Sequence, residues 1–378
     1  MDEYLQLLAA AKARITEVSA EAADIAGTLV IDVREPNELA IGLLPNAVSI
    51  PLGELESRIG SVIDDTSTPI LLYCTVGERS AIAAATLEDA GYSDVVSLAG
   101  GIRLWMAQGR PTMTDTALSG QERQRYARHI VMPTVGTAGQ ERLRDAAVVI
   151  VGAGGLGSPC ALYLAAAGIG TLGIVDDDVV ELSNLQRQIL HSTTDLGRPK
   201  PDSACERLTA MNPEITVAAH RTRLTADNAL EILAGYDVIV DGTDNFATRY
   251  LINDASMHLG IPVVHGSVFR FEGQVAVFRP YETACYRCVF PEPPPIELAP
   301  NCAVAGVFGV LPGVIGTMQA TEVLKLLLSI GTPLAGKLLA YDALDQETHT
   351  VRLQRNPDCI ACGDREQPPD LRDEDEYC

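Results

Sequence analysis

Two groups of cysteines are the residues of this chain best suited to chemistry. Cys74 lies on a loop that also carries Gly77 and Arg79 and leads into a predicted helix over 80–90. The positive end of that helix, its backbone amides and the arginine could stabilise a thiolate or a persulfide and lower the pKa of the thiol. A free cysteine more commonly packs as a small apolar residue. Gly77 and Arg79 favour the reactive interpretation.

A second group of four cysteines forms two CxxC pairs, which 70 residues separate. Two such pairs can place four thiolates in a tetrahedron, the usual arrangement of a structural zinc ion. Because the protein would fill all four coordination positions, the metal would stabilise the fold and take no part in a reaction. The alternative is a pair of redox dithiols. The candidate ligands are Cys285, Cys288, Cys359 and Cys362.

A glycine-rich turn, between a predicted strand over 146–151 and a predicted helix over 158–167, is the candidate phosphate-binding element. Gly152, Gly154 and Gly155 would let backbone amides and the helix N-terminus approach a phosphate. The GxGxxG pattern alone is shared by dinucleotide dehydrogenases and other nucleotide-binding enzymes. Asp176, after the next predicted strand, suits the ribose of either NAD or ATP.

The polar residues further along the chain favour ATP. Asn184, Arg187 and Lys200 would supply an amide and two cations, which a triphosphate needs when its α-phosphate is attacked and pyrophosphate leaves. Asp244 follows a predicted strand over 238–241, at the edge where doubly wound sheets bind ligands, and could hold Mg²⁺. A nicotinamide site would instead need an apolar ring pocket and a hydride acceptor, and the sequence offers no candidate for the acceptor.

The elements that must position these residues predict an α/β protein of two domains and a tail. Strands and helices alternate over residues 1–112, which predicts a small parallel sheet with helices on both faces. Residues 113–120 are predicted to be a linker. A Rossmann-like doubly wound domain with the zinc site is expected over 121–363, beginning with a helix over 121–128. The acidic residues 364–378 lack apolar periodicity and are predicted to form a solvated, mobile tail.

Charge and composition limit the partners. The chain of 378 residues has a formal net charge of −22, which argues against nucleic acid or an anionic membrane as the main partner. It has no basic and apolar N-terminal signal and no apolar run of about 18 residues. Nine cysteines in such a chain suggest metal and thiol chemistry rather than a disulfide framework. We therefore expect a cytoplasmic protein.

The first domain resembles the rhodanese family of sulfurtransferases over about residues 12–112. The resemblance rests on the Cys74–Arg79 loop, DVRE at 32–35, the proline turn LPNA at 44–47 and AGGIRLW at 99–105. It implies that Cys74 carries a persulfide, that Arg79 helps to hold it, and that Asp32 and Arg34 support the loop. Gly42-Leu43 stands where many members have Gly-His, a departure that does not touch the nucleophile.

The second domain resembles the sulfur-carrier adenylyltransferases of the ThiF and MoeB type, within the ubiquitin-activating-like superfamily. The match runs from about residue 125 to 363 and includes the cysteine pairs. Its further motifs are RYARHI at 125–130, GAGGLGS at 152–158, DDDVVELSNLQRQ at 176–188, GRPK at 197–200, DGTDN at 241–245 and NCAVAGVFGVLPGVIG at 301–316.

This second resemblance implies a role for each candidate residue. Asp176 would bind the ribose, and Asp244 would position magnesium and be the residue most needed for adenylylation. Arg128 matches an arginine that reaches the partner's ATP across a dimer, so a homodimer is implied. Cys302 matches a cysteine of sulfur or thioester relay in some members, and could equally be a loop cysteine without a role. The implied nucleotide-binding residues are Gly152, Gly154, Gly155, Asp176, Asn184, Arg187, Lys200 and Asp244.

Together the two resemblances imply one pathway. ATP would adenylylate the C-terminal glycine carboxylate of a ubiquitin-like sulfur carrier, and the Cys74 persulfide, loaded by a donor such as a cysteine desulfurase, would convert it to a thiocarboxylate. The carrier could serve molybdopterin, thiamin, cysteine, tRNA thiolation or secondary metabolism. The alternatives are an NAD(P)-dependent oxidoreductase with a thiol domain and a non-catalytic scaffold that docks a carrier. In fused relatives the rhodanese unit is expected more often at the C-terminus.

Overall fold

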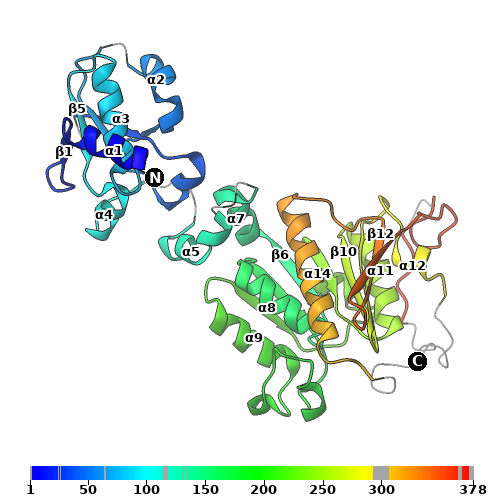
Figure 1. The fold of residues 1–378 in the computed structure, drawn as a ribbon. Coiled ribbons are helices and arrows are strands. Elements are labelled where there is room, and N and C mark those ends of the chain that lie inside the picture. The colour runs from blue at the N-terminus through cyan, green and yellow to red at the C-terminus, as the bar shows by residue number, and fades with distance from the viewer. Residues whose placement is uncertain are drawn as a thin grey trace. The chain divides into compact units, whose positions relative to one another are not determined.

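The computed structural model describes residues 2–23, 25, 27–63, 65–113, 118–130, 132, 134–292, 306–364 and 368–373. The chain divides into two compact units, Met1–Ala138 and Gly139–Cys378 (Figure 1). This division lies further along the chain than the predicted linker, because two short helices after the linker belong with the first unit. Each unit has its own sheet and core.

The described part of the first unit contains a five-stranded parallel sheet in the order β1-β5-β4-β2-β3. Its central strands are mostly apolar, as expected for strands covered on both faces, and Asp32 in β2 and Ser97 in β5 are the polar exceptions. Ile31 and Leu72 pack in one core, and Val30 and Leu71 pack with Trp105 in the other. The strands are β1 Thr16–Val18, β2 Leu29–Asp32, β3 Val48–Ser49, β4 Ile70–Tyr73 and β5 Val95–Leu98.

The helices of this unit agree with the predicted α/β alternation. The predicted helix over 121–128 is divided at Tyr126 into α5 and α6, and α5 begins at a capping box in which Ser119 and Glu122 exchange hydrogen bonds. The helices are α1 Asp2–Lys12, η1 Pro36–Ile41, η2 Leu52–Glu54, α2 Leu55–Arg58, η3 Ile59–Ser61, α3 Glu78–Asp89, α4 Gly101–Ala107, α5 Gly120–Arg125 and α6 Ala127–Ile130; α7, Gly136–Asp145, crosses into the second unit.

The described part of the second unit contains an eight-stranded sheet in the order β13-β12-β11-β10-β9-β6-β7-β8. Strands β10, β9, β6, β7 and β8 are parallel, which confirms the Rossmann-like prediction. Strands β11 to β13 extend the sheet in antiparallel fashion, and the sequence did not predict the last two. The strands are β6 Ala147–Val151, β7 Thr171–Val175, β8 Thr216–His220, β9 Val238–Asp241, β10 Val263–Phe269, β11 Glu272–Phe278, β12 Lys337–Asp342 and β13 Glu347–Arg352.

Helices cover this sheet on both sides (Figure 1). Helix α14 packs beside α8 and over β10 and β11, where Gly273 leaves room for Ile315. Within the described ranges, none of the helices combines the length and apolar character needed to traverse a bilayer. The helices are α8 Gly157–Ala167, η4 Leu182–Asn184, η5 Thr193–Asp195, α9 Lys200–Met211, α10 Ala229–Leu233, α11 Phe246–Leu259, α12 Tyr286–Val289 and α14 Leu311–Leu328.

The described part of the predicted tail, residues 368–373, lies against the second unit. The carbonyl of Pro369 lies 2.7 Å from His258 Nε2, and the amide of Ala226 donates to Asp373 (2.8 Å). Leu371 packs against the core beneath α10 and α11. A few apolar and hydrogen-bonding residues anchor a segment whose composition alone resembles a solvated chain.

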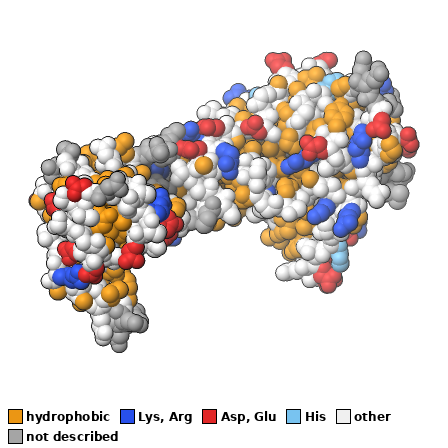
Figure 2. All heavy atoms as spheres, turned by 90° about the horizontal axis from the view of Figure 1, so that it is seen from above, with side chains coloured by type: hydrophobic (Ala, Val, Ile, Leu, Met, Phe, Trp, Pro, Cys, Tyr) orange, Lys and Arg blue, Asp and Glu red, His pale blue; other side chains and the backbone are white. Residues whose placement is uncertain are grey.

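Charge on the surface is mixed. On the face drawn in Figure 2, Lys and Arg side chains lie interspersed with Asp and Glu side chains. The whole sequence contains 50 acidic and 28 basic residues. Mixed surface charge of this kind favours solubility and gives nucleic acid no extended basic track on the face drawn.

Candidate active sites and metal site

The Cys74 thiol lies at the end of β4 and is almost fully buried, with 1% exposure. The amide of Gly77 donates to its sulfur (3.1 Å), and the hydroxyl of Ser80 lies 3.7 Å from it. Gly77 adopts φ +90°, a left-handed conformation that suits glycine and turns the loop into α3. The sulfur therefore lies in a cradle of amide and hydroxyl donors at a helix N-terminus.

This cradle changes the acidity of the thiol. Burial alone would raise the pKa of Cys74, but hydrogen bonds from the amide and hydroxyl of Ser80 and from the amides of Val76 and Gly77 outweigh it. The net effect is a pKa of Cys74 below its ordinary value, which favours the nucleophilic thiolate. Helix α4 also holds the loop in place, because the amide of Ile102 donates to the Cys74 carbonyl (2.9 Å).

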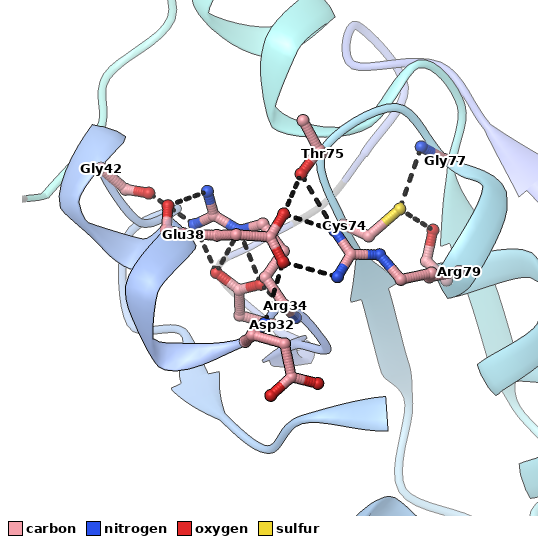
Figure 3. A network of polar contacts seen from close by, with 10 residues as sticks. Asp32, Arg34, Glu38, Gly42, Cys74, Thr75, Gly77 and Arg79 are labelled. Carbon is pink, nitrogen blue, oxygen red and sulfur yellow. Dashed lines mark hydrogen bonds and ion pairs between the residues drawn. The ribbon is translucent and has the colours of Figure 1, made fainter. Parts of the chain in front are cut away.

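Arg79 extends toward Glu38 rather than toward the sulfur (Figure 3). Its two terminal nitrogens donate to the two carboxylate oxygens of Glu38 at 2.6 and 2.5 Å. Thr75 also donates to Glu38 (2.8 Å). The sequence placed Arg79 beside the persulfide and did not single out Glu38, which lies 41 residues away in the chain.

Asp32 and Arg34 support this arrangement from the core, in the role that the rhodanese resemblance implies. Arg34 is fully buried and pairs with Asp32 (2.6 Å). Its guanidinium also donates to the carbonyl of Glu38 in η1 (3.0 Å) and to the carbonyl of Gly42, directly after η1 (2.7 Å). The buried pair therefore fixes the segment that carries Glu38.

A cavity of about 380 Å³ lies at the carboxyl ends of β6, β7 and β9 in the second unit. This is the edge at which doubly wound sheets bind ligands. Gly152 adopts φ +97°, and a side chain there would collide with the Gly242 backbone, so the turn requires glycine. Seven of the predicted residues line the cavity: Gly152, Gly154, Gly155, Asp176, Arg187, Lys200 and Asp244.

Asp176 and Lys200 form the buried polar side of the cavity. The Asp176 carboxylate accepts hydrogen bonds from the amides of Ala153 (2.7 Å) and Asp178 (2.9 Å), which ties it to the glycine turn. Burial raises the pKa of Asp176, and Lys200 opposes that effect. Lys200 is 4% exposed and donates to Asp178 (2.7 Å). A buried ammonium beside carboxylates is a ready partner for phosphate oxygens.

The other predicted residues lie in different places. Asp244 is exposed at the cavity, just after β9. Asn184 is absent from the described cavity lining, and its side chain accepts from the Glu181 amide (3.0 Å) to begin η4. Arg128 is exposed on α6 in the first unit. Cys302 lies outside the described residues.

Two buried histidines support the cavity and were not singled out from the sequence. His191 is bonded through Nε2 to the Ala153 carbonyl (3.0 Å) and through Nδ1 to Ser203 (2.9 Å), and burial lowers its pKa. Its neutral ring therefore donates to the glycine turn and accepts from the serine. His265 pairs with Asp241 (2.7 Å), which also anchors the turn that carries Asp244.

Arg223 also lines the cavity and was missed. It follows β8 in an irregular segment, where no motif marks it. Gln188 and Thr243 are further polar lining residues. Both residues lie in motifs that the sequence analysis identified, but the sequence did not show that their side chains line the cavity.

The four cysteines of the two CxxC pairs converge in the second unit. Their sulfurs lie 3.9 Å (Cys285 to Cys288), 3.6 Å (Cys285 to Cys359) and 3.3 Å (Cys288 to Cys362) apart. A tetrahedron with Zn–S bonds of about 2.3 Å places its sulfurs roughly 3.8 Å apart. The donor set and its spacing therefore fit a tetrahedral zinc ion that joins α12 to the C-terminal segment.

Comparison with known proteins defines the class. Residues 126–361 match the model of the ThiF family, and residues 15–108 match the model of the rhodanese-like domain. The chain belongs to the ThiF family and carries a rhodanese-like domain in front of the matched region. Both predicted resemblances are thereby confirmed.

Several named relatives are similar to the second part of the chain. A sulfur carrier protein adenylyltransferase of Thermus thermophilus is 53% identical over 264 residues, which cover 68% of this chain and 97% of that protein. The SAMP-activating enzyme E1 of Haloferax volcanii is 51% identical, covering 66% and 92%. The probable adenylyltransferase/sulfurtransferase MoeZ of Mycobacterium tuberculosis is 48% identical, covering 67% of this chain and 66% of that protein.

Solved structures share the fold of the second part. E. coli MccB, crystallised with AMPCPP and MccA, is 25% identical with a TM-score of 0.56, over 63% of this chain and 74% of that chain. PaaA is 26% identical with a TM-score of 0.56, over 65% and 77%.

Proposed function

We propose that this protein activates a ubiquitin-like sulfur carrier with ATP and then converts its C-terminal carboxylate to a thiocarboxylate. The observation that carries the proposal is the cavity that brings the glycine turn, Asp176, Lys200 and Asp244 together. It lies in a chain 53% identical to a sulfur carrier protein adenylyltransferase. No feature of the described cavity favours the oxidoreductase or the scaffold alternative.

In the first step a carboxylate oxygen of the carrier's C-terminal glycine attacks the α-phosphorus of ATP. The bond to the β-phosphate oxygen breaks, pyrophosphate leaves with the electron pair, and an acyl-adenylate forms. Arg187 and Lys200 neutralise the charge that develops on the phosphates. Asn184 contributes an amide, and Asp176 holds the ribose.

Mg²⁺ and Zn²⁺ fit separate parts of the second unit. Asp244 is the ligand we propose for Mg²⁺, a hard cation that prefers carboxylate oxygens and would neutralise phosphate charge. Zn²⁺ would be held by the four cysteines and supply stability rather than chemistry, because no coordination position stays open.

In the second step sulfur passes from the first unit to the activated carrier. The terminal sulfur of a Cys74 persulfide attacks the acyl carbon, and AMP leaves, so that carrier and Cys74 are joined as an acyl disulfide. A second thiolate then attacks the Cys74 sulfur and releases the carrier thiocarboxylate with the electron pair. Cys302 is the thiol we propose for this step, and an external dithiol reduces the resulting disulfide.

Three partners follow from this proposal. The carrier ends in glycine, a protein persulfide donor such as a cysteine desulfurase reloads Cys74, and a second copy of the chain supplies Arg128 to the phosphates. We also retain the predicted division into a rhodanese-like domain over 1–112, a linker over 113–120, an adenylyltransferase domain over 121–363 and a C-terminal segment over 364–378.

Exchange of labelled pyrophosphate into ATP tests the first step. The full chain, with Mg²⁺ and a panel of ubiquitin-like carriers that end in glycine, should show exchange only with its matched carrier. Cys74→Ala should keep the exchange and lose thiocarboxylate, whereas Cys205→Ala, which removes another free cysteine, should keep both. Absence of exchange with every carrier contradicts activation, and normal thiocarboxylate from Cys74→Ala contradicts the sulfur step.

A further inference from the structure

Glu38 occupies the position from which it can control the charge of the Cys74 loop. The segment from Cys74 to Ser80 contains one cationic residue, Arg79. Both terminal nitrogens of that guanidinium donate to Glu38, at 2.6 and 2.5 Å (Figure 3). Bidentate pairs of this kind are among the strongest charge-assisted hydrogen bonds in proteins.

Glu38 is fixed in this position by the surrounding fold. Its carboxylate accepts the Thr75 hydroxyl (2.8 Å) and the Glu35 amide (3.1 Å) in addition to Arg79. Its backbone carbonyl accepts from the buried Arg34 (3.0 Å). Arg79 and Thr75 hydrogen bonds hold the pKa of Glu38 at about 2. The carboxylate is therefore ionised and already oriented at neutral pH.

The sulfur, by contrast, is bound by neutral donors. Gly77 and Ser80 contact Cys74, while the cation of the loop is paired elsewhere. Hydrogen bonds and charge from Glu38 raise the pKa of Arg79 most, and Cys74 and Glu35 raise it further by their charge. Tyr4 on α1 stays neutral, because burial and the charges of Glu78 and Cys74 raise its pKa. The thiolate is therefore held by neutral amide and hydroxyl donors, while the guanidinium of Arg79 forms its hydrogen bonds to Glu38 and Thr75.

We propose that Glu38 is a specificity-determining residue, which withdraws Arg79 from the sulfur and so disfavours sulfur donors of high negative charge. The inference rests on the proposed role of Cys74 as a persulfide carrier. A donor that presents a terminal persulfide on a protein brings little charge to the loop. A small dianion such as thiosulfate brings two charges and finds the loop arginine already paired.

The two kinds of donor react by balanced steps. The Cys74 thiolate attacks the terminal sulfur of a persulfide R–S–SH, and R–S⁻ leaves, so that Cys74–S–SH forms. With thiosulfate it attacks the sulfane sulfur, and sulfite leaves with the electron pair, so that Cys74–S–S⁻ forms. Cyanide then removes the outer sulfur as thiocyanate and restores the thiolate.

A comparison of two small donors tests this inference on the full chain. Thiosulfate carries two negative charges and methanethiosulfonate carries one, and both deliver a sulfane sulfur to the same thiolate. The ratio of their kcat/KM values, with cyanide as acceptor, measures tolerance of the extra charge. In Glu38→Gln the ratio of kcat/KM for thiosulfate to kcat/KM for methanethiosulfonate should rise about tenfold. Removal of one charge near a half-exposed site changes the binding of a charged donor by one to two powers of ten at most. Glu38→Ala should act in the same direction.

Two controls separate this effect from general changes. Glu54→Gln removes the same charge and breaks an exposed pair with Arg58 (2.8 Å), and it should leave the ratio unchanged. In the Glu38→Gln/Arg79→Ala double variant the gain should disappear, because it depends on the freed guanidinium. A purely structural role for Glu38 would lower the rates with both donors together.

The outcomes distinguish this inference from the function on which it rests. If the unmodified chain takes sulfur from methanethiosulfonate or from a cysteine desulfurase, but Glu38→Gln and Glu38→Ala keep its donor ratio, the role of Glu38 is overturned and Cys74 remains a sulfur carrier. If the unmodified chain acquires no persulfide on Cys74 from any donor, the role of Glu38 and the proposed role of Cys74 as a sulfur carrier are both overturned.

Discussion

The ammonium of Lys200 lies 2.7 Å from the carboxylate of Asp178, although only 4% of Lys200 is exposed. The same ammonium lies 3.9 Å from Asp176. Asp178 itself is exposed, so a ligand that enters the cavity can take its place beside the lysine without breaking the contact to Asp176. A buried ammonium needs a compensating charge, which Asp178 supplies in this structure and which a phosphate would supply under the proposed function.

Replacement of Lys200 should therefore remove catalysis. We expect Lys200→Ala to lower kcat/KM for carrier-dependent pyrophosphate exchange by about 100-fold or more, as loss of one charge-stabilising donor does in other active sites. Arg198→Ala removes a nearby cation that pairs with Asp195 and Glu206 outside the described cavity lining, and it should stay within about twofold of the parent. If Lys200→Ala catalysed pyrophosphate exchange at the parent rate, that result would contradict a role of Lys200 in binding phosphate.

Arg128 should act across a dimer. Arg128→Ala and Lys200→Ala should each be inactive alone, and a mixture of the two should recover exchange. A mixed dimer contains one Arg128→Ala chain and one Lys200→Ala chain. The active site of the Arg128→Ala chain keeps Lys200 and receives Arg128 from the other chain, so one of the two sites is complete. Subunits should first be separated and reassociated, and sedimentation should confirm the dimer. Inactive mixed dimers would show that Arg128 serves its own chain or neither.

The four-cysteine site should bind one zinc ion per chain and stabilise the second unit. Cys359→Ser should lose the metal and lower the melting temperature of that unit on the order of 10 °C, since each 1 kcal/mol shifts the midpoint of a domain of this size by about 2–4 °C. Elemental analysis and calorimetry provide the measurements. Cys205→Ser should change neither quantity, and a metal-free parent protein with the same melting temperature would contradict the assignment.

The acidity of Cys74 should depend on Ser80. Because the pKa of Cys74 is lowered, its thiolate is populated at pH values below the ordinary thiol range and declines as pH falls through that pKa. Ser80→Ala removes a hydroxyl donor, so the pKa should rise and alkylation of Cys74 should require a higher pH. Peptide mapping after iodoacetamide treatment measures the Cys74 rate at each pH. Ser57→Ala, at an exposed position, is the control, and an unchanged profile in Ser80→Ala would contradict the cradle.

Local signals in the sequence were sufficient for several elements. The strand, glycine turn and helix at 147–167 follow from an apolar run, glycines and a helical segment that adjoin one another. The Cys74 loop and its helix are local in the same sense. Each CxxC pair holds its two thiolates close by its own spacing, so their joint use as ligands required only that the two pairs meet.

The tertiary structure decided the contacts between residues far apart in sequence. Glu38 meets Arg79 because β2 and β4 are neighbours and the segments after them lie at one edge of the sheet. Asp241 meets His265 because the two are register partners in the adjacent strands β9 and β10. The sequence does not show which strands are neighbours. The docking of Leu371 depends on an apolar surface formed by other elements. Propensity and spacing act over a few residues, whereas these pairings depend on strand order and on burial, which exist only once the sheet has formed. The sequence by itself therefore determined which residues are candidates for the chemistry, and the fold decided which charged groups surround them.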